Sequence, residues 1–166
     1  MPDALPELAI TGPTLSDFEH ARERVSTAIA VTPMESSRFL GDLLGSPVYL
    51  KAENLQRTGS YKIRGAYNRM SLLSAEEKSR GVVAASAGNH AQGVALAARQ
   101  LGIAATIFMP VGVALPKLQA TRDYGAEVVL RGHNVDESLR AAAEFAASTG
   151  AVFIPPFDHP DDRTAG

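Results

Sequence analysis

The chain has 166 residues, a net charge of −2 and no cysteine. This length suffices for one domain with a hydrophobic core, or for one domain and part of another. The charge balance offers no basic excess for nucleic acid or an anionic membrane, and the lack of cysteine excludes disulfides and thiolate metal sites. We expect a cytoplasmic protein, because the acidic start "MPDALPELAI" does not resemble a signal peptide and no apolar run could span a bilayer.

The first third of the chain predicts a loose arm over residues 1–13, then helices over 14–30 and 36–44 and a strand over 47–54. Thr14 and Asp17 have the spacing of a capping box at the start of the first helix. A second such pair, Ser74 and Glu77, begins a short helix further along.

From residue 60 onward, helices and short apolar strands alternate. We expect helices over 60–73, 89–102, 115–125 and 135–150, and strands over 81–86, 103–110, 126–132 and 151–156. Strand–helix alternation of this kind is typical of an α/β fold, in which a parallel sheet carries helices on both faces.

Ligands of open parallel sheets gather at the carboxyl ends of the strands. Polar clusters follow three expected strands, at residues 51–62, 86–93 and 110–117. In the second cluster, "SAGNHAQG", a tight turn into a helix would point free backbone N–H groups at an anion. The alternative is an ordinary helix start capped by Ser86 or Asn89, with His90 as a structural histidine.

The first cluster ends in Lys62, which follows the aromatic Tyr61. A desolvated lysine amine can form a Schiff base, whereas a solvated helix lysine is the simpler interpretation. The glycines do not match the dinucleotide fingerprint or the phosphate loop, and H-E-x-x-H and G-x-S-x-G are both absent. An unrelated nucleotide-binding α/β domain is therefore disfavoured.

"ENLQRTGSYKIRGA" (residues 53–66) and "SAGNHAQG" (86–93), in this order and spacing, resemble the serine/threonine dehydratase family of pyridoxal-phosphate enzymes. Weaker similarity runs through "GIAATIFMP", "PKLQATRDYGAEVVL" and "FIPPFDHP". Threonine dehydratase (threonine ammonia-lyase) resembles the chain most closely. The resemblance implies a fold type II enzyme that deaminates L-threonine to 2-oxobutanoate, or L-serine to pyruvate, releasing ammonia.

The same resemblance implies roles for particular residues. Lys62 would carry pyridoxal 5'-phosphate as a Schiff base and take the Cα proton, with Tyr61 near the cofactor ring. Asn89 would bind the cofactor's 3-oxygen. The substrate carboxylate would be bound, largely through backbone N–H groups, by Ser86, Ala87, Gly88, Asn89 and His90. Serine racemases of this group carry a serine at the position of Ala87, so Ala87 favours elimination over racemisation.

The resemblance also predicts how the chain is divided. Residues 1–49 would belong to part of a larger domain, 50–154 to the small α/β domain, and 155–166 to the start of the truncated larger domain. The family's glycine-rich phosphate loop has no counterpart here, since no run of glycines occurs. Two alternatives remain open: a non-catalytic relative that acts as a binding module, and an enzyme similar to serine racemase. We expect a small amino-acid substrate, no nucleic-acid or membrane partner, and a homo-oligomer in the full-length family.

Overall fold

The structure is a computed structural model that describes residues 12–156. The predicted arm at residues 1–13 and the predicted segment 155–166 therefore lie largely outside the described residues. No helix within residues 12–156 is long and apolar enough to cross a membrane.

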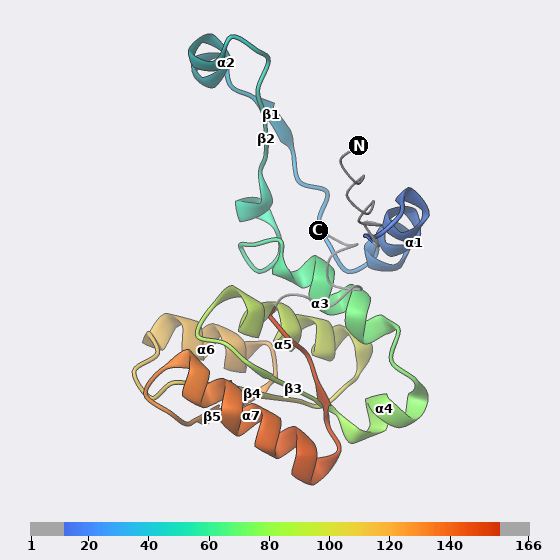
Figure 1. Ribbon diagram of the computed structural model, residues 1–166, viewed down its shortest axis with the longest axis vertical. Helices are drawn as coiled ribbons and strands as arrows, with labels where there is room; N and C mark the ends of the chain where they lie inside the picture. Colours follow the sequence, from blue (N-terminus) through green and yellow to red (C-terminus); the bar gives the residue numbers. More distant parts are fainter. Residues whose placement is uncertain (1–11, 157–166) are drawn as a thin grey trace, which may run out of the picture.

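The centre of the molecule is a four-stranded parallel sheet (Figure 1). Its strands, in spatial order, are β5 (Glu127–Leu130), β4 (Ala105–Met109), β3 (Val82–Ala85) and β6 (Val152–Phe153). Every residue of β3 is buried, because helices cover both faces of this central strand. The predicted α/β fold with a parallel sheet is confirmed.

Two helical layers enclose the sheet (Figure 1). One face carries α3 (Lys62–Ser71), α5 (Asn89–Leu101) and α6 (Leu115–Asp123), whose apolar side chains share a core with Ile107 of β4. The other face carries α7 (Val135–Thr149), where Phe145 packs against Phe108 with ring centroids 5.6 Å apart. This arrangement leaves α3 and α5 in contact along one face, which brings together the two segments that carry the resemblance.

Two flanking helices begin at the capping boxes that the sequence predicts. Thr14 caps α1 (Leu15–Val25) and Ser74 caps α4 (Ala75–Arg80), each with a reciprocal bond from the acidic residue three positions on. Helix α1 rests on α3 through a small cluster that includes Ala21 and Val25.

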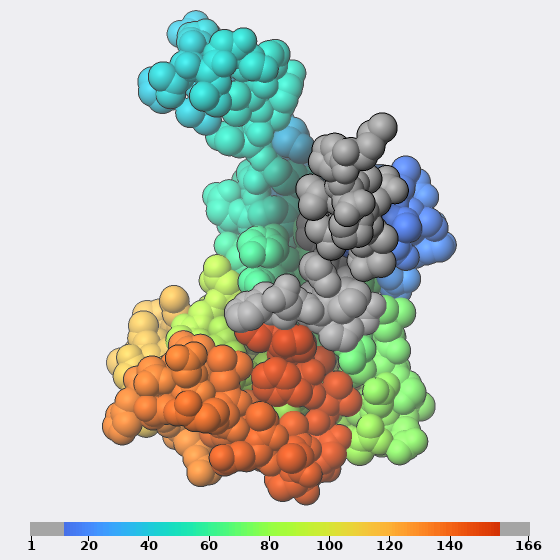
Figure 2. Space-filling model, viewed as in Figure 1, coloured from blue at the N-terminus to red at the C-terminus, as the bar shows by residue number. Residues whose placement is uncertain are grey.

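The part of the chain between α1 and α3 in the sequence forms a thin arm that extends from this body. It consists of β1 (Met34–Ser36), β2 (Tyr49–Lys51) and, at its tip, α2 (Arg38–Leu44), and none of these elements contains a buried residue. Figure 2 shows the tip as a knob joined to the rest by a narrow neck.

The arm corrects one sequence prediction. The strand expected at residues 47–54 is predicted to join the parallel sheet, with the first polar cluster at its carboxyl end. It is instead β2, which pairs antiparallel with β1 in a separate two-stranded sheet. The physical reason is local: the short α2 turns the chain back on itself, so residue 49 meets residue 36 before any distant strand. The predicted division at residue 50 remains a prediction.

Candidate active site

Lys62 is the first residue of α3 and follows a loop that returns from the arm. Thr58 and Ser60 of this loop are buried, and the Lys62 backbone N–H donates to Ser60 Oγ at 3.4 Å. The loop begins with a short 3₁₀ turn, η1 (Glu53–Leu55). Buried polar residues therefore define the path of the chain immediately before the lysine.

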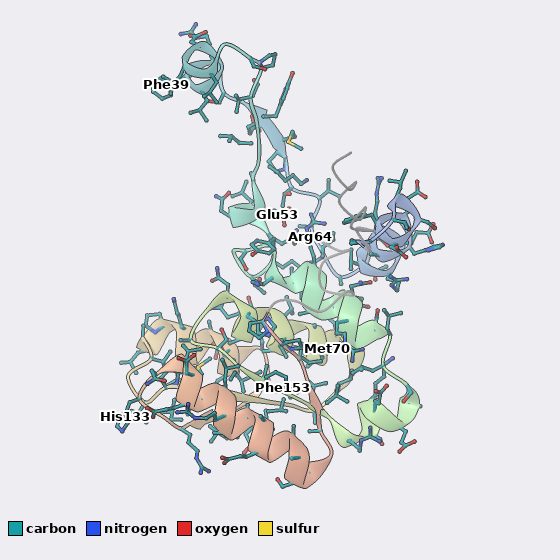
Figure 3. The ribbon with its side chains drawn as sticks, viewed as in Figure 1. Phe39, Glu53, Arg64, Met70, His133 and Phe153 are labelled. Atoms are coloured by element: carbon teal, nitrogen blue, oxygen red, sulfur yellow. The ribbon has the colours of Figure 1, made fainter. Side chains whose placement is uncertain are left out.

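An ion pair closes the ends of this loop. Arg64 of α3 donates to both oxygens of Glu53, from Nε at 2.9 Å and from Nη2 at 2.8 Å, and Figure 3 shows the two residues together below the arm. The Thr32 hydroxyl also donates to this carboxylate. The Arg64 guanidinium, helped by Thr32, lowers the pKa of Glu53 to about 2, so this carboxylate is charged at neutral pH.

Gln56 ties the same loop to the segment that follows α1. Its Oε1 accepts from the Ala30 backbone N–H at 2.7 Å, and its Nε2 donates to the Ala30 carbonyl at 2.8 Å. Gln56 is buried, so these bonds are shielded from water. The sequence predicted no individual role for Glu53, Gln56 or Arg64. The only signal was their place in "ENLQRTGSYKIRGA".

The turn into α5 contradicts both of the caps that the sequence allows. The N-cap is Gly88, and no side chain caps this helix, so neither Ser86 nor Asn89 acts as its cap. Ser86 Oγ instead accepts from the Gly88 N–H at 3.1 Å inside the turn. Asn89 is exposed and Ala87 is partly buried. The first turn of α5 is thus free of a side-chain cap that would compete with an anionic ligand.

Gly93 is the point at which α5 packs closely against the backbone of Lys62. A Cβ atom at Gly93 would lie 3.0 Å from the Lys62 carbonyl carbon and 3.1 Å from its oxygen. Glycine lets α5 approach the backbone of α3 at this point. The two motifs are therefore in direct backbone contact.

The side chains of Lys62 and His90 both reach the segment after β6. Lys62 Nζ donates to the Pro156 carbonyl at 2.6 Å, and His90 Nε2 lies 3.1 Å from the Ile154 carbonyl oxygen. His90 is buried, and this burial lowers its pKa to about 4. The His90 side chain therefore points away from solvent, and only the backbone N–H of this residue is left for the expected carboxylate.

Tyr61 and Lys117 complete the surroundings. The Lys62 ammonium lies 5.3 Å from the centre of the Tyr61 ring, within range of a cation–π contact. Tyr61 also lines a cavity of about 550 Å³ together with Lys51, Glu53 and other residues. Lys117 of α6, for which the sequence predicted no chemistry, places its amine 3.5 Å from the position of a Cβ on Gly88. The second and third polar clusters thus meet.

Comparison with known proteins identifies the class. The family described as "Pyridoxal-phosphate dependent enzyme" matches residues 25–166, so the chain belongs to that family. It is 52% identical over 147 residues to L-threonine ammonia-lyase of Thermotoga maritima, covering 89% of this chain and 37% of that one.

Solved structures show the same relationship. Processed threonine deaminase isoform 2 from Solanum lycopersicum is 40% identical, with a TM-score of 0.83 over 99% of this chain and 48% of that one. Maize serine racemase is 30% identical, with a TM-score of 0.86 over 93% of this chain and 47% of that one. The chain spans less than half the length of each of these relatives.

The described residues fit the aldehyde end of pyridoxal phosphate. Lys62 offers a partly buried amine, Tyr61 an aromatic face, and Asn89 an exposed amide at an uncapped helix start. A metal ion has no comparable donor set here, since residues 12–156 contain no group of three or more histidine, aspartate or glutamate side chains suited to one. The donor set therefore agrees with the family's cofactor.

Proposed function

We propose that this site deaminates L-threonine to 2-oxobutanoate and ammonia with pyridoxal 5'-phosphate, and treats L-serine in the same way to give pyruvate. One observation carries the proposal: the backbone of Lys62 packs against Gly93 of the "SAGNHAQG" helix in a chain 52% identical to an L-threonine ammonia-lyase. An amine and an anion-binding turn are the two features that an α-amino acid substrate requires.

Lys62 has two tasks in this proposal. Its amine attaches the cofactor, and once free, Nζ takes the proton from the substrate Cα. When bound, the cofactor supplies a conjugated ring that delocalises the electrons left on Cα. The Tyr61 ring, 5.3 Å from the amine, would lie near the ring of the attached cofactor. Asn89 would orient the cofactor by a hydrogen bond to its 3-oxygen.

The turn at residues 86–90 would bind the substrate carboxylate. The uncapped N–H groups of Asn89 and His90 carry the partial positive charge of the helix start. Gly88 adds no side chain there, and the Lys117 amine nearby adds positive charge. The carboxylate would thus be held while the Cα–H bond faces Lys62.

A racemase is the second candidate, because maize serine racemase shares the fold with a TM-score of 0.86. Racemisation needs an acid on the face of Cα opposite the lysine. Ala87 offers no hydroxyl for this, so we propose elimination as the main reaction. An Ala87→Ser variant should gain measurable racemisation of serine relative to deamination. Chiral chromatography of the remaining serine measures this gain.

The division of the chain belongs to the same proposal. Residues 50–154 would form the small domain, whereas 1–49 and 155–166 would pack with a larger domain. We further propose a cytoplasmic homo-oligomer with no nucleic-acid or membrane partner. Analytical ultracentrifugation of the protein tests whether it forms an oligomer.

The first experiment is capture of the cofactor. Pyridoxal phosphate is added, borohydride reduces any imine, and mass spectrometry finds the modified peptide. We expect modification at Lys62, its loss in Lys62→Arg, and little modification of Lys51 or Lys78. Production of 2-oxobutanoate from threonine is measured next. Equal modification of every lysine would contradict a preformed site. Selective capture at Lys62 without turnover of threonine would favour the alternative of a non-catalytic binding module.

A further inference from the structure

His90 occupies an unusual place for a histidine. It lies in the first turn of α5 among buried alanine and valine residues and is 6% exposed. A carbonyl oxygen can only accept, so the 3.1 Å contact with Ile154 requires that His90 carry its proton on Nε2. The pKa of about 4 means that the ring is neutral near pH 7. His90 is therefore a neutral donor aimed at one backbone group.

The backbone group it meets ends the ordered pairing of β6. The Ile154 N–H still donates to the Val83 carbonyl of β3, at 2.8 Å. The next two residues, Pro155 and Pro156, have no N–H and cannot extend the ladder. The bond from His90 to the Ile154 carbonyl therefore holds this segment at the point where sheet pairing stops.

The Lys62 amine depends on the carbonyl two residues further on. Its Nζ donates to Pro156 O at 2.6 Å, a short distance for an ammonium and a carbonyl oxygen. A lysine side chain has four rotatable bonds, so without such an acceptor the amine would be spread over many positions. The position of the amine thus follows the position of residues 154–156.

We infer that His90 is a positioning residue for Lys62: it holds the Ile154 carbonyl, and so places the Pro156 carbonyl that receives the Lys62 amine. The inference rests on the proposed function for the chemical use of that amine, but the geometry does not depend on the cofactor. It gives the His90 side chain a task distinct from binding substrate, for which this turn would use mainly its backbone N–H groups.

The test uses the whole chain with its lysines reductively methylated with carbon-13, which gives one NMR signal for each lysine. Lys62→Arg assigns the signal of interest. The variants are His90→Phe, which removes the donor, and His90→Gln, whose amide can donate from nearly the same place. His133→Phe is the control, since His133 lies exposed in the loop before α7 and away from α5 (Figure 3).

We expect the Lys62 signal to move to the position of exposed lysines in His90→Phe, and to keep its own position in His90→Gln and His133→Phe. Borohydride capture of pyridoxal phosphate at Lys62 should fall at least about fivefold in His90→Phe and stay within about twofold in His90→Gln. An unmoved signal in a folded His90→Phe chain, or equal loss in both His90 variants, overturns the inference.

The two proposals can fail separately. If the parent chain captures no cofactor but the Lys62 signal follows His90, positioning stands and the proposed function fails. If capture is selective but indifferent to His90, positioning alone fails. A measurement on the parent chain needs no variant: nitrogen-15 NMR should show the neutral Nε2–H form of His90 at pH 7. The Nδ1–H form would overturn the inference.

Discussion

The two sheets of this molecule have opposite surroundings, and their residues differ accordingly: β3 is wholly apolar, whereas β1 and β2 mix apolar with charged residues. In the parallel sheet, β3 is buried along its whole length between α5 on one face and α7 on the other. In the arm, every residue of β1 and β2 is exposed, and Leu43 and Leu44 of α2 are 69% and 67% exposed. The contrast shows that apolar side chains such as Leu43 and Leu44 become part of a core only where a second layer covers them.

The largest difference should appear when an apolar side chain is shortened in each region. Met70 of α3 is fully buried in the core that α3 shares with α5 and the sheet, and Figure 3 shows it at the end of α3. Met70→Ala should lower the free energy of unfolding by about 2–5 kcal/mol, because it removes packing and leaves a cavity. Leu44→Ala should change it by less than about 0.5 kcal/mol. Urea denaturation measures both, and equal losses would refute the contrast.

The contact between α3 and α5 gives the next effect. In Gly93→Val the new side chain meets the Lys62 backbone, which cannot move aside as a side chain can. We expect a loss of about 1–3 kcal/mol and weaker cofactor capture at Lys62. A Cβ atom at Gly112 would meet nothing within 4 Å beyond its chain neighbours, so Gly112→Val is the matched control. Thermal unfolding and borohydride capture are the measurements.

The Glu53–Arg64 pair should make stability depend on acid. The native pKa of Glu53 is about 2, below its ordinary 4.5, so its stabilisation is complete above pH 4.5 and lost as the pH falls towards 2. Glu53→Gln should remove about 1–2 kcal/mol of this dependence. Glu35→Gln, an exposed change in the arm, should leave the acid limb unaltered. Urea denaturation at a series of pH values measures the free energy of unfolding of both variants and so compares their acid dependence.

The smallest effect concerns helix caps. Ser74 caps α4. This helix is tied to its surroundings because Lys78 donates to the Ser71 carbonyl and Arg80 to the Gly150 carbonyl. Ser74→Ala should cost about 1 kcal/mol of global stability. Ser37 caps α2, which buries nothing, so Ser37→Ala should speed hydrogen exchange in α2 and leave global unfolding unchanged. A global loss in Ser37→Ala would mean that the arm folds together with the sheet.

Much of the sheet was predictable because its signals are local. Runs such as "GVVAAS" between helix caps and glycines predicted β3 and its neighbours, and the capping boxes at Thr14 and Ser74 were confirmed. The prediction that the strand at residues 47–54 joins the parallel sheet was wrong, because pairing is decided by which strand lies nearest in space. The predicted roles of Lys62, Tyr61 and the residues at 86–90 remain predictions.

The sequence by itself determined the alternation of strands and helices, the family and the pair of motifs that point to pyridoxal phosphate, since each is written in neighbouring residues. Only the tertiary structure decided that Gly93 meets the Lys62 backbone and that Glu53 pairs with Arg64. It also decided that His90 and Lys62 bind carbonyls two residues apart after β6. These contacts join residues up to 94 positions apart, and long-range packing of this kind leaves no local pattern to read.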